Sequence, residues 1–476
     1  MRQLFILRMM DIPCTLPELS LLQKIAGAAS ANKTPAFLVG GFVRDKIMGR
    51  PTKDIDVVCL GDAIAVAQTL SGKETSVNVF KNFGTAQVVI DGFDVEFVGA
   101  RKESYAHHSR KPTVEPGTLE DDQNRRDFTI NAMAISLNQD DFGRLVDPFN
   151  GLQHIKEKKL VTPLAPGITF SDDPLRMMRG IRFASQLNFT LTPETFEAIK
   201  ENAYRISIVS GERIADELNK ILLSEKPSIG FNLLFESGLL QLIFPQMVAL
   251  SGAEYIDGLG HKDNFTHTLQ VVDNIAQKTG DLWLRWAAVL HDIAKPVTKK
   301  FEEGHGWTFH GHEVVGGRMV PKIFARLKLP QNEKMKLVRK LVEMHLRPIG
   351  LTKENITDSA IRRLLFDAGE DFDSLMMLCE ADITSKNKQK RKRFLENFEI
   401  VRQRCAEVEE KDHLRNWQPP VSGEMIMKEF NLKPGKEVGI IKNAIREAIL
   451  DGIIPNNYDA AVELMREKAR ELGVSK

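Results

Sequence analysis

The chain has 476 residues, of which 42% are hydrophobic and 27% are charged, as is usual for a soluble globular protein of more than one domain. Its 65 Lys and Arg residues almost balance its 64 Asp and Glu residues, so overall charge does not indicate a nucleic-acid partner and any basic surface must be local. The four cysteines form no CxxC pair and no apolar run is as long as a membrane span, which argues against a zinc ribbon and a membrane protein and favours the cytoplasm.

The first 150 residues combine strand and helix patterns. Short apolar runs predict strands at 54–60, 86–92, 94–100 and 134–137, with a helix at 63–70. Residues 36–49 read as a strand, a Gly-Gly turn and the start of a helix. This is the pattern of an α/β or α+β unit. The segment from 101 to 124 is rich in His, Ser, Pro, Gly and Asp and predicts a long mobile loop.

Helical patterns dominate from about residue 172 onwards. Amphipathic helices are predicted in 193–206, 211–223 and 227–245, followed by a linker at 250–264. Residues 265–385 are again helical and carry most of the histidines. A basic run, "KNKQKRKR", covers 386–393, and the last 90 residues read as charged helices. A charge run of this kind is usually a solvated helix face.

An acidic pair lies inside the strand predicted at 54–60. Asp54 and Asp56 are two positions apart, so they point to the same face of the strand and repel each other unless something positive lies between them. Metal-assisted phosphoryl or nucleotidyl transfer uses carboxylates shared by two cations about 3.5–4 Å apart. Magnesium prefers such oxygen ligands. On its own, the pair is better explained as the solvated face of an edge strand.

Two neighbouring segments favour the metal interpretation. Gly40 and Gly41 end an apolar strand where backbone amides could hold a phosphate, and Arg44 follows on the first helical turn. Glu96 lies between Val and Phe in another predicted strand, where a buried acid needs a partner or a metal. The alternatives are that Gly40 and Gly41 form an ordinary turn without a ligand and that Glu96 points outward to solvent.

Basic residues near these acids offer phosphate contacts. Arg125, Arg126 and Asp127 precede an apolar segment, and Arg matches the geometry of phosphate oxygens, although a structural salt bridge would explain Asp127 equally well. On a helix spanning 171–187, three further arginines would share one face. These arginines are Arg176, Arg179 and Arg182, and the acids Asp172 and Asp173 precede them. Three positive charges on one face repel each other unless a bound anion, or salt bridges with these two acids, neutralise them.

In order and spacing, these motifs resemble the head domain of the class II tRNA nucleotidyltransferases, the family of CCA-adding enzymes and bacterial poly(A) polymerases. The resemblance is carried by "LVGGFVRD", "DID", "RRDFTINA" and "SDDPLRMMR". It implies an α+β fold, in which a polymerase-beta-like head with a mixed sheet precedes all-α neck, HD and tail domains. The expected division is 1–150 head, 151–250 neck, 251–385 HD domain and 386–476 tail.

The resemblance also implies roles for the residues singled out above. Asp54 and Asp56 would hold two Mg²⁺ ions, with Glu96 as a third catalytic carboxylate. Asp173 and Arg176 would read the base edge of CTP or ATP in place of a nucleic-acid template, although Asp172 stands where the family usually has Glu. The full expected nucleotide site is Gly40, Gly41, Arg44, Arg126, Asp127, Asp173, Arg176, Arg179 and Arg182.

A second constellation lies in the histidine-rich region. His291 and Asp292 are adjacent inside a predicted apolar helix. Burial of two polar side chains there is costly unless they have partners or a ligand. Further His and Asp residues could complete a mixed N/O site. The order resembles the HD superfamily of metal-dependent phosphohydrolases, which implies a divalent transition metal on His267, His291, Asp292 and Asp382, with a second metal or a phosphate at His312 and His345. A helical scaffold with an inactive site is the alternative.

The resulting hypothesis is a CTP/ATP-dependent enzyme that builds or repairs the CCA end of tRNA and releases pyrophosphate. The expected partners are tRNA, CTP and ATP, with no membrane and no obligate protein partner. The tail and the basic run would help to hold the RNA. The alternatives are a poly(A) polymerase, an enzyme that adds only CC or only A, an HD phosphohydrolase with an RNA-binding head, and a non-enzymatic RNA-binding protein.

Overall fold

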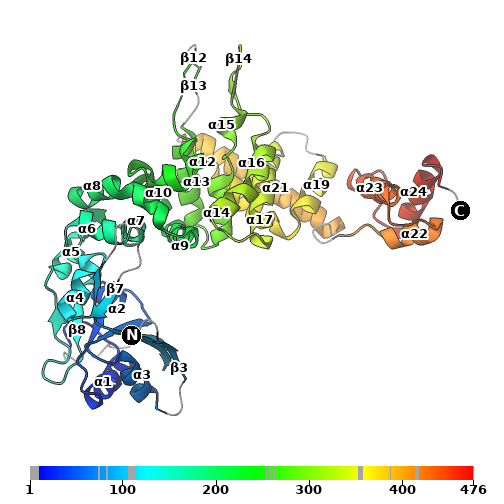
Figure 1. The fold of residues 1–476 in the computed structure, drawn as a ribbon. Helices are drawn as coiled ribbons and strands as arrows, with labels where there is room; N and C mark the ends of the chain where they lie inside the picture. Colours follow the sequence, from blue (N-terminus) through cyan, green and yellow to red (C-terminus); the bar gives the residue numbers. More distant parts are fainter. Residues whose placement is uncertain are drawn as a thin grey trace. The chain divides into compact units, whose positions relative to one another are not determined.

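The computed structural model describes residues 10–72, 76–81, 84–104, 113–253, 255–256, 259–260, 263–351, 357–385, 387–412 and 417–474. The chain divides into two compact units, Met1–Pro245 and Gln246–Lys476 (Figure 1). The first is α+β and the second is almost entirely helical, which confirms the predicted fold class. The finer division into four domains stays a prediction.

A seven-stranded mixed sheet forms the start of the first unit, with the strand order β3-β4-β5-β2-β1-β8-β9. The strands β2 and β5 are parallel and the other neighbours are antiparallel. Their bounds are β1 Ala36–Val39, β2 Asp54–Cys59, β3 Val77–Phe80, β4 Thr85–Ile90, β5 Phe93–Gly99, β8 Ala134–Ser136 and β9 Leu145–Val146. The strands predicted from apolar runs are therefore present.

One face of this sheet is apolar and covered by helices. The helices α1 (Leu16–Ala31) and α3 (Ala63–Ser71) contribute to a buried core with Ile55 and Val57 of β2 and Val95 of β5 (Figure 1). Because side chains alternate along a strand, residues 54, 56 and 96 must point to the opposite face. The hydrophobic pattern thus fixes which face of the sheet carries the acids.

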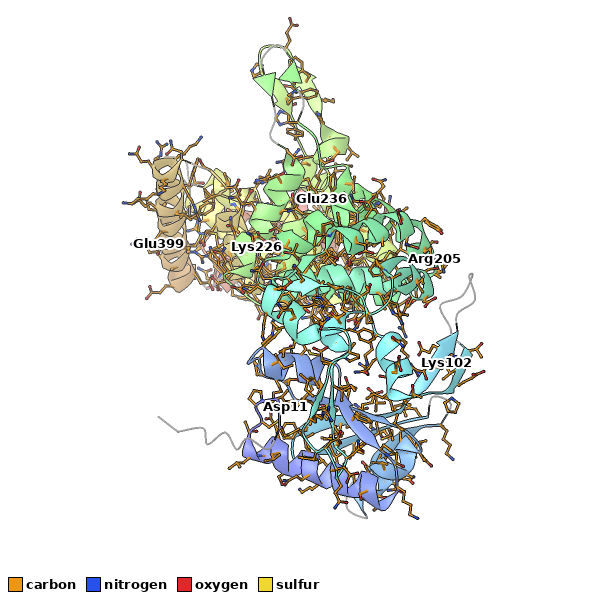
Figure 2. All side chains as sticks on the ribbon, turned by 90° about the vertical axis from the view of Figure 1, so that its left-hand side faces the viewer. Asp11, Lys102, Arg205, Lys226, Glu236 and Glu399 are labelled. Atoms are coloured by element: carbon orange, nitrogen blue, oxygen red, sulfur yellow. The ribbon has the colours of Figure 1, made fainter. Side chains whose placement is uncertain are left out.

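The prediction of a long loop at 101–124 is wrong for the described residues. The strands β6 (Arg101–Ser104) and β7 (Thr113–Pro116) pair as an antiparallel hairpin, on which Figure 2 labels Lys102, and residues 105–112 lie outside the described part. The helix α4 (Leu119–Asn124) follows at once. Thr118 and Asp121 cap its start reciprocally, an arrangement that the sequence "TLED" could have indicated.

The remaining elements of the first unit are mostly short helices. The helix predicted across 171–187 is broken, because α6 ends at Asp172, the proline ring of Pro174 disfavours a helical conformation at Asp173, and α7 begins at Leu175. The elements are η2 Thr129–Asn131, α5 Gly151–Glu157, β10 Lys159–Leu160, α6 Pro166–Asp172, α7 Leu175–Leu187, β11 Thr190–Leu191, α8 Pro193–Asn202, η3 Ala203–Ile208, α9 Gly211–Leu222, α10 Pro227–Glu236, α11 Leu239–Ile243 and, across the unit boundary, α12 Pro245–Val248.

The second unit contains the histidine-rich helices and a small C-terminal bundle with its own apolar core. Two small hairpins, β12–β13 and β14–β15, interrupt regions expected to be linker and helix. The elements are β12 Tyr255–Ile256, β13 Leu259–Gly260, α13 Asn264–Ala276, α14 Leu282–Leu290, α15 Lys295–Thr298, β14 Lys300–Glu302, β15 Gly306–Thr308, α16 His312–Arg326, α17 Glu333–Met344, α18 Arg347–Gly350, α19 Asp358–Ala368, η4 Gly369–Asp371, α20 Phe372–Ala381, α21 Lys388–Asp412, α22 Gly423–Phe430, α23 Lys436–Leu450 and α24 Tyr458–Glu471. Within the described ranges, no helix combines the length and apolar character needed to cross a bilayer.

Candidate functional site

Three acids converge on the open face of the sheet. Asp56 of β2 stands directly opposite Glu96 of β5 in the parallel register, and Asp54 lies two residues before Asp56 on the same face. Asp54 and Glu96 are exposed and Asp56 is half-buried. The expectation that Glu96 is buried is therefore wrong, because the Val and Phe residues beside it point into the core while Glu96 points away from it.

The electrostatics of Asp56 show how crowded this face is. The pKa of Asp56 is raised to about 6, chiefly because the carboxyl is buried; Arg126 opposes this rise, and Glu96 and Asp54 add to it. The backbone also comes close, because a Cβ added at Gly40 would lie 3.0 Å from Asp56 Oδ2 and 3.3 Å from Arg126 Nη1. Three carboxylates with one nearby guanidinium fit the binding of divalent cations, which favour such oxygen ligands.

A cavity of about 500 Å³ opens beside this acidic pair and gathers the expected nucleotide site. Its lining includes Asp54, Asp56 and all the residues predicted to bind nucleotide: Gly40, Gly41, Arg44, Arg126, Asp127, Asp173, Arg176, Arg179 and Arg182. Glu96 lines a second cavity of about 500 Å³, which shares Asp56, Arg125 and Arg126 with the first. The carboxylates therefore stand where two cavities adjoin.

The arginines of α7 are held by acids from other elements. Arg179 Nε donates to Asp127 Oδ2 at 2.6 Å, and Arg182 Nε donates to Glu217 Oε2 on α9 at 2.6 Å. Asp127 also accepts from Asn131 Nδ2 at 3.0 Å. Although burial opposes it, Arg179 and Asn131 hold the pKa of Asp127 well below its usual range. Asp127 thus orients Arg179 toward the cavity, and its own oxygens are engaged.

One aromatic ring joins the basic groups of the cavity. The ring of Phe183 is 4.2 Å from the Arg182 guanidinium, 5.2 Å from that of Arg44 and 5.4 Å from that of Arg179. Arg44 Nη1 also donates to Asn131 Oδ1 at 2.7 Å. The sequence interpretation did not single out Phe183, Glu217 or Asn131, since none of them is in a pattern of like residues.

The two residues expected to read a base lie at the break between α6 and α7. Asp173 Oδ1 accepts from the Leu175 amide at 3.2 Å, and Arg176 Nη1 donates to the Thr169 carbonyl at 3.4 Å. Only 8% of Arg176 is exposed, which restricts its guanidinium to few orientations. The cavity lining includes Asp173 and Arg176, whereas Asp172 is not among the described residues that line it.

We expect Asp127→Ala to lower the free energy of unfolding by about 3 kcal/mol at pH 7, because the guanidinium of Arg179 loses its partner. The depressed pKa stabilises the fold above the carboxyl's unfolded value, and this stabilisation is lost as the pH falls. Urea denaturation at pH 7 and pH 3.5 measures the effect. The control Asp216→Ala removes an acid that is 62% exposed and paired with Lys220. An equal effect of both variants at pH 7 would contradict the assignment.

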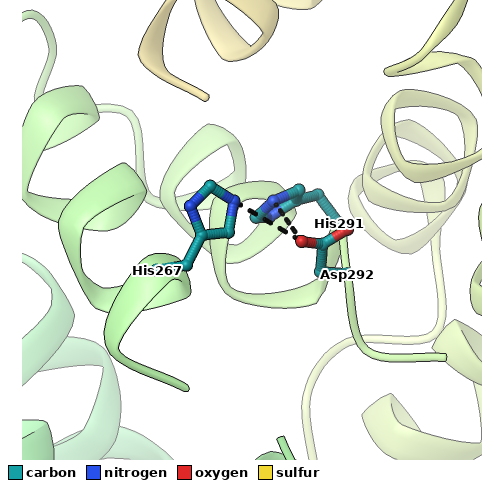
Figure 3. A group of neighbouring side chains, drawn as sticks. All are labelled: His267, His291 and Asp292. Carbon is teal, nitrogen blue, oxygen red and sulfur yellow. Dashed lines mark ion pairs between the residues drawn. The ribbon is translucent and has the colours of Figure 1, made fainter. Parts of the chain in front are cut away.

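The second unit brings all six predicted HD ligands together. His291 and Asp292 do not lie inside an apolar helix as predicted but follow the end of α14 at Leu290. Asp292 Oδ1 lies 3.2 Å from His312 Nε2, and its Oδ2 lies 3.2 Å from His291 Nε2 and 3.5 Å from His267 Nε2 (Figure 3). The other close pairs are His267 Nε2 to Asp382 Oδ1 at 2.9 Å, His291 Nε2 to Asp382 Oδ1 at 3.6 Å and His345 Nε2 to Asp292 Oδ1 at 4.0 Å.

The imidazoles are oriented as metal ligands are. His291, His312 and His345 each have Nδ1 within 2.8 Å of a backbone carbonyl, so Nδ1 donates and Nε2 is turned toward Asp292. The three Nε2 atoms are buried and have no hydrogen-bond partner within the described part of the chain. Burial lowers the pKa of His345 to about 4, which keeps its imidazole neutral. These orphaned nitrogens fit a bound cation.

The donor atoms fall into two overlapping groups. His267, His291 and Asp292 form one, and Asp292, His312 and His345 form the other, each with its donor atoms within 4.8 Å of one another. The two oxygens of Asp292 face different groups, since Oδ2 is nearest His291 and Oδ1 is nearest His312. A carboxylate shared in this way suits two adjacent cations.

Comparisons with known protein families match three successive parts of the chain. Residues 36–161 match the family described as the poly A polymerase head domain. Residues 188–250 match a probable RNA- and SrmB-binding site of polymerase A, and residues 264–385 match the HD domain. The acid pair thus falls in the first match and the six HD ligands fall in the third.

Similar proteins extend over nearly the whole chain. An A-adding tRNA nucleotidyltransferase of Deinococcus radiodurans is 31% identical over 447 residues, which cover 90% of this chain and 95% of that protein. A multifunctional CCA protein of Pseudomonas fluorescens is 31% identical over 369 residues, covering 73% and 84%. The CCA-adding enzyme of Bacillus stearothermophilus, solved in complex with CTP, shares the fold with a TM-score of 0.69 and 24% identity, covering 97% of this chain and all of that one.

Proposed function

The chain belongs to the family of tRNA nucleotidyltransferases and poly(A) polymerases, and we propose that it extends the 3′ end of tRNA to CCA with CTP and ATP, without a template. The observation that carries this proposal is the first cavity. It combines a carboxylate pair, a cluster of arginines, and Asp173 with the nearly buried Arg176 in one space of about 500 Å³. That volume is sufficient for a nucleoside triphosphate.

Each group in this cavity has a task that its chemistry supports. Arg44, Arg179 and Arg182 present guanidinium groups to the triphosphate, and their pairing with fixed acids keeps them in place. Asp173 accepts from the exocyclic amino group that C and A share, and Arg176 donates to a ring nitrogen or carbonyl. Reading the base from two held side chains explains how a nucleotide is chosen without a template.

The carboxylates of the sheet serve the transfer itself. The ribose 3′ oxygen of the tRNA bonds to the α-phosphorus, the bond from that phosphorus to the β-phosphate oxygen breaks, and pyrophosphate leaves. Enzymes of this family use divalent metals, and we assign Mg²⁺ to Asp54 and Asp56, where it would lower the pKa of the hydroxyl and neutralise the phosphates. Glu96 lies beside Asp56 and faces the second cavity.

Addition of A alone is the second candidate, and a specific observation favours it. The match to the A-adding relative covers 90% of this chain, whereas the match to the CCA protein covers 73%.

The test incubates purified protein with tRNA lacking CCA, and separately with tRNA ending in CC, with each NTP alone and with all four together. Sequencing the products should show CCA on the first substrate and A on the second. Extension of only the CC-ended tRNA would establish A-only addition, and long A tracts would establish a poly(A) polymerase.

The HD cluster supports an additional phosphohydrolase activity. Its orphaned imidazole nitrogens and shared carboxylate form a divalent-cation site, which would supply a bound water of lowered pKa. The protein's own part is to orient the ligands, since each of His291, His312 and His345 is fixed by a hydrogen bond to a carbonyl. An inactive scaffold would have no need for this number of oriented nitrogens in a buried space.

We expect the double variant His291→Ala, Asp292→Ala to lose bound divalent metal and any phosphomonoesterase activity, while nucleotide incorporation continues. Elemental analysis of the purified protein measures the metal, and release of inorganic phosphate measures hydrolysis. The matched control is Asp54→Ala, Asp56→Ala, which should keep the HD metal. Unchanged metal content in the first variant would show that these residues do not hold it.

A further inference from the structure

The first unit contains a buried acid that lines neither cavity of the head but contacts residues that line both. Asp122, on α4, is 0% exposed. Burial raises the pKa of its carboxyl, but Arg126 and Arg125 outweigh burial and hold this pKa below its usual value, so Asp122 is ionised. It is not among the described residues that line the first or the second cavity. Its carboxylate therefore acts on a substrate in these cavities only through its neighbours.

Each oxygen of this carboxylate holds a different arginine. Asp122 Oδ2 accepts from Arg126 Nε at 2.9 Å and lies 2.8 Å from Arg126 Nη2. Asp122 Oδ1 accepts from Arg125 Nε at 3.0 Å and also from Arg125 Nη2. A guanidinium that is bound through Nε and one Nη has a single orientation. One buried acid thus fixes the directions of two adjacent arginines.

Arg125 is held from its other side as well. Its Nη1 donates to Glu103 Oε1 on β6 at 3.4 Å, and Arg101 Nε lies 2.7 Å from the same oxygen. The side chain of Glu103 is 3% exposed, so this contact is buried too. Asp122 is therefore one member of a series of alternating charges that extends into the β6–β7 hairpin. This series anchors Asp122 and keeps its Oδ2 directed toward Arg126.

From this anchor, Arg126 extends to the place where the two cavities adjoin. It lines both cavities together with Asp56, and its Nη1 donates to the Asn131 carbonyl at 3.4 Å. A Cβ on Gly40 would lie 3.3 Å from Arg126 Nη1 and 3.0 Å from Asp56 Oδ2, so both groups approach the same point. Within the described residues, however, Arg126 forms its ion pair with Asp122 and not with any of the three acids of the sheet.

This choice of partner matters because opposite charges attract strongly at a partly buried site. A guanidinium released from Asp122 would move onto Asp56. There it would occupy the oxygens to which we assign Mg²⁺, and it would no longer face the phosphates of the nucleotide. A single buried carboxylate thus prevents an arginine of the site from competing with the cations of the same site.

We propose that Asp122 is a positioning residue, which directs Arg126 to the phosphates of the nucleotide and withholds it from the carboxylates that bind Mg²⁺. The inference rests on the proposed nucleotidyl transfer. It predicts that loss of the charge at position 122 raises the Mg²⁺ requirement of nucleotide binding, and that this effect depends on the presence of Arg126. A residue that merely stabilised α4 would not produce such a dependence.

The test measures binding without reaction. A fluorescent ATP analogue with a CH₂ group between its α- and β-phosphorus is bound to the full chain, and the midpoint is the Mg²⁺ concentration that gives half-maximal binding. Asp122→Asn, which keeps the size of the side chain, should raise this midpoint about tenfold. The control Glu120→Gln removes a charge from an exposed position of the same helix and should change the midpoint less than about twofold.

The same substitution in an Arg126→Ala background separates positioning from a loss of structure. Without the guanidinium nothing competes for Asp56, so Asp122→Asn should now change the midpoint less than about twofold. An equal shift in both backgrounds, or no shift in the first, would overturn the inference. Circular dichroism confirms that each variant is folded.

Arg126→Ala alone tests the same idea if Asp122→Asn does not fold. It should weaken binding of the analogue at saturating Mg²⁺ and change the midpoint less than about threefold, because a guanidinium held by Asp122 does not compete with the cation. A midpoint lowered about tenfold would show that Arg126 already competes in the unmodified protein, and would overturn the inference. If the unmodified protein binds the analogue but adds no nucleotide to tRNA, the proposed function fails, whereas the midpoints still decide the role of Asp122.

Discussion

Replacing Asp54 and Asp56 together by alanine is expected to reduce nucleotide incorporation by at least about 10⁴-fold. The two carboxylates stand on one face of β2, opposite Glu96, and line the cavity that contains the arginines. Without them, Glu96 alone remains of the three acids that converge on that face, which is too little to hold the cations that would neutralise the triphosphate. Incorporation of labelled CMP or AMP into tRNA measures the effect, and tRNA binding should change little.

A matched control comes from the same sheet. Asp91 lies in the turn between β4 and β5, is 58% exposed and pairs with Lys24 on the surface. Asp91→Ala removes a carboxylate of the head without touching the cavity and should incorporate nucleotide at the rate of the unmodified protein. Robust incorporation by the Asp54, Asp56 double variant would refute the assignment of the metal site.

Arg176→Ala is expected to relax the choice among the four nucleotides by about 10- to 100-fold, measured as the ratio of kcat/KM for CTP or ATP to that for UTP or GTP. The guanidinium is nearly buried and is restrained by the Thr169 carbonyl, so it offers its donors in a fixed direction. An amino group of C or A would donate to Asp173 in this arrangement, whereas the carbonyl of U or G would offer that carboxylate no hydrogen.

The triphosphate should still bind in this variant, because Arg179 and Arg182 keep their own partners. The KM for the preferred nucleotide is therefore expected to rise less than the discrimination falls. Lys200→Ala, on the surface of α8 beside Glu197, is the control and should alter neither. Undiminished rejection of UTP and GTP by Arg176→Ala would show that the base is read elsewhere.

Asp54 and Asp56 show which features of the site could be predicted from the local sequence pattern. Alternation along β2 is a local property, and from it the shared face of Asp54 and Asp56 follows directly. The pairing of β2 with β5 is not local, since it joins residues 40 positions apart, Asp56 and Glu96. The neighbouring Val and Phe suggested a buried Glu96, but burial of alternate residues leaves the intervening one exposed.

The segment from 101 to 124 shows the opposite error. Its composition favoured a loop, yet Arg101–Ser104 and Thr113–Pro116 pair as strands and a capped helix begins at Leu119. The sequence did indicate the helix cap, because Thr118 and Asp121 are three residues apart. It did not indicate the hairpin, because amino-acid composition does not show which two segments pair as strands.

The sequence by itself determined that the head mixes strands and helices, where its strands at 54–60, 86–92, 94–100 and 134–137 lie, and most of the residues that gather in the two centres. Those features depend on side-chain type and on the spacing of residues close together in the chain, and the amino-acid sequence specifies both directly. Only the tertiary structure decided that Asp127 and Glu217 hold the arginines, that Phe183 lies among them, and that Asp292 faces two groups of histidines. These contacts join distant positions through folding of the chain, and their geometry depends on packing that no local pattern specifies.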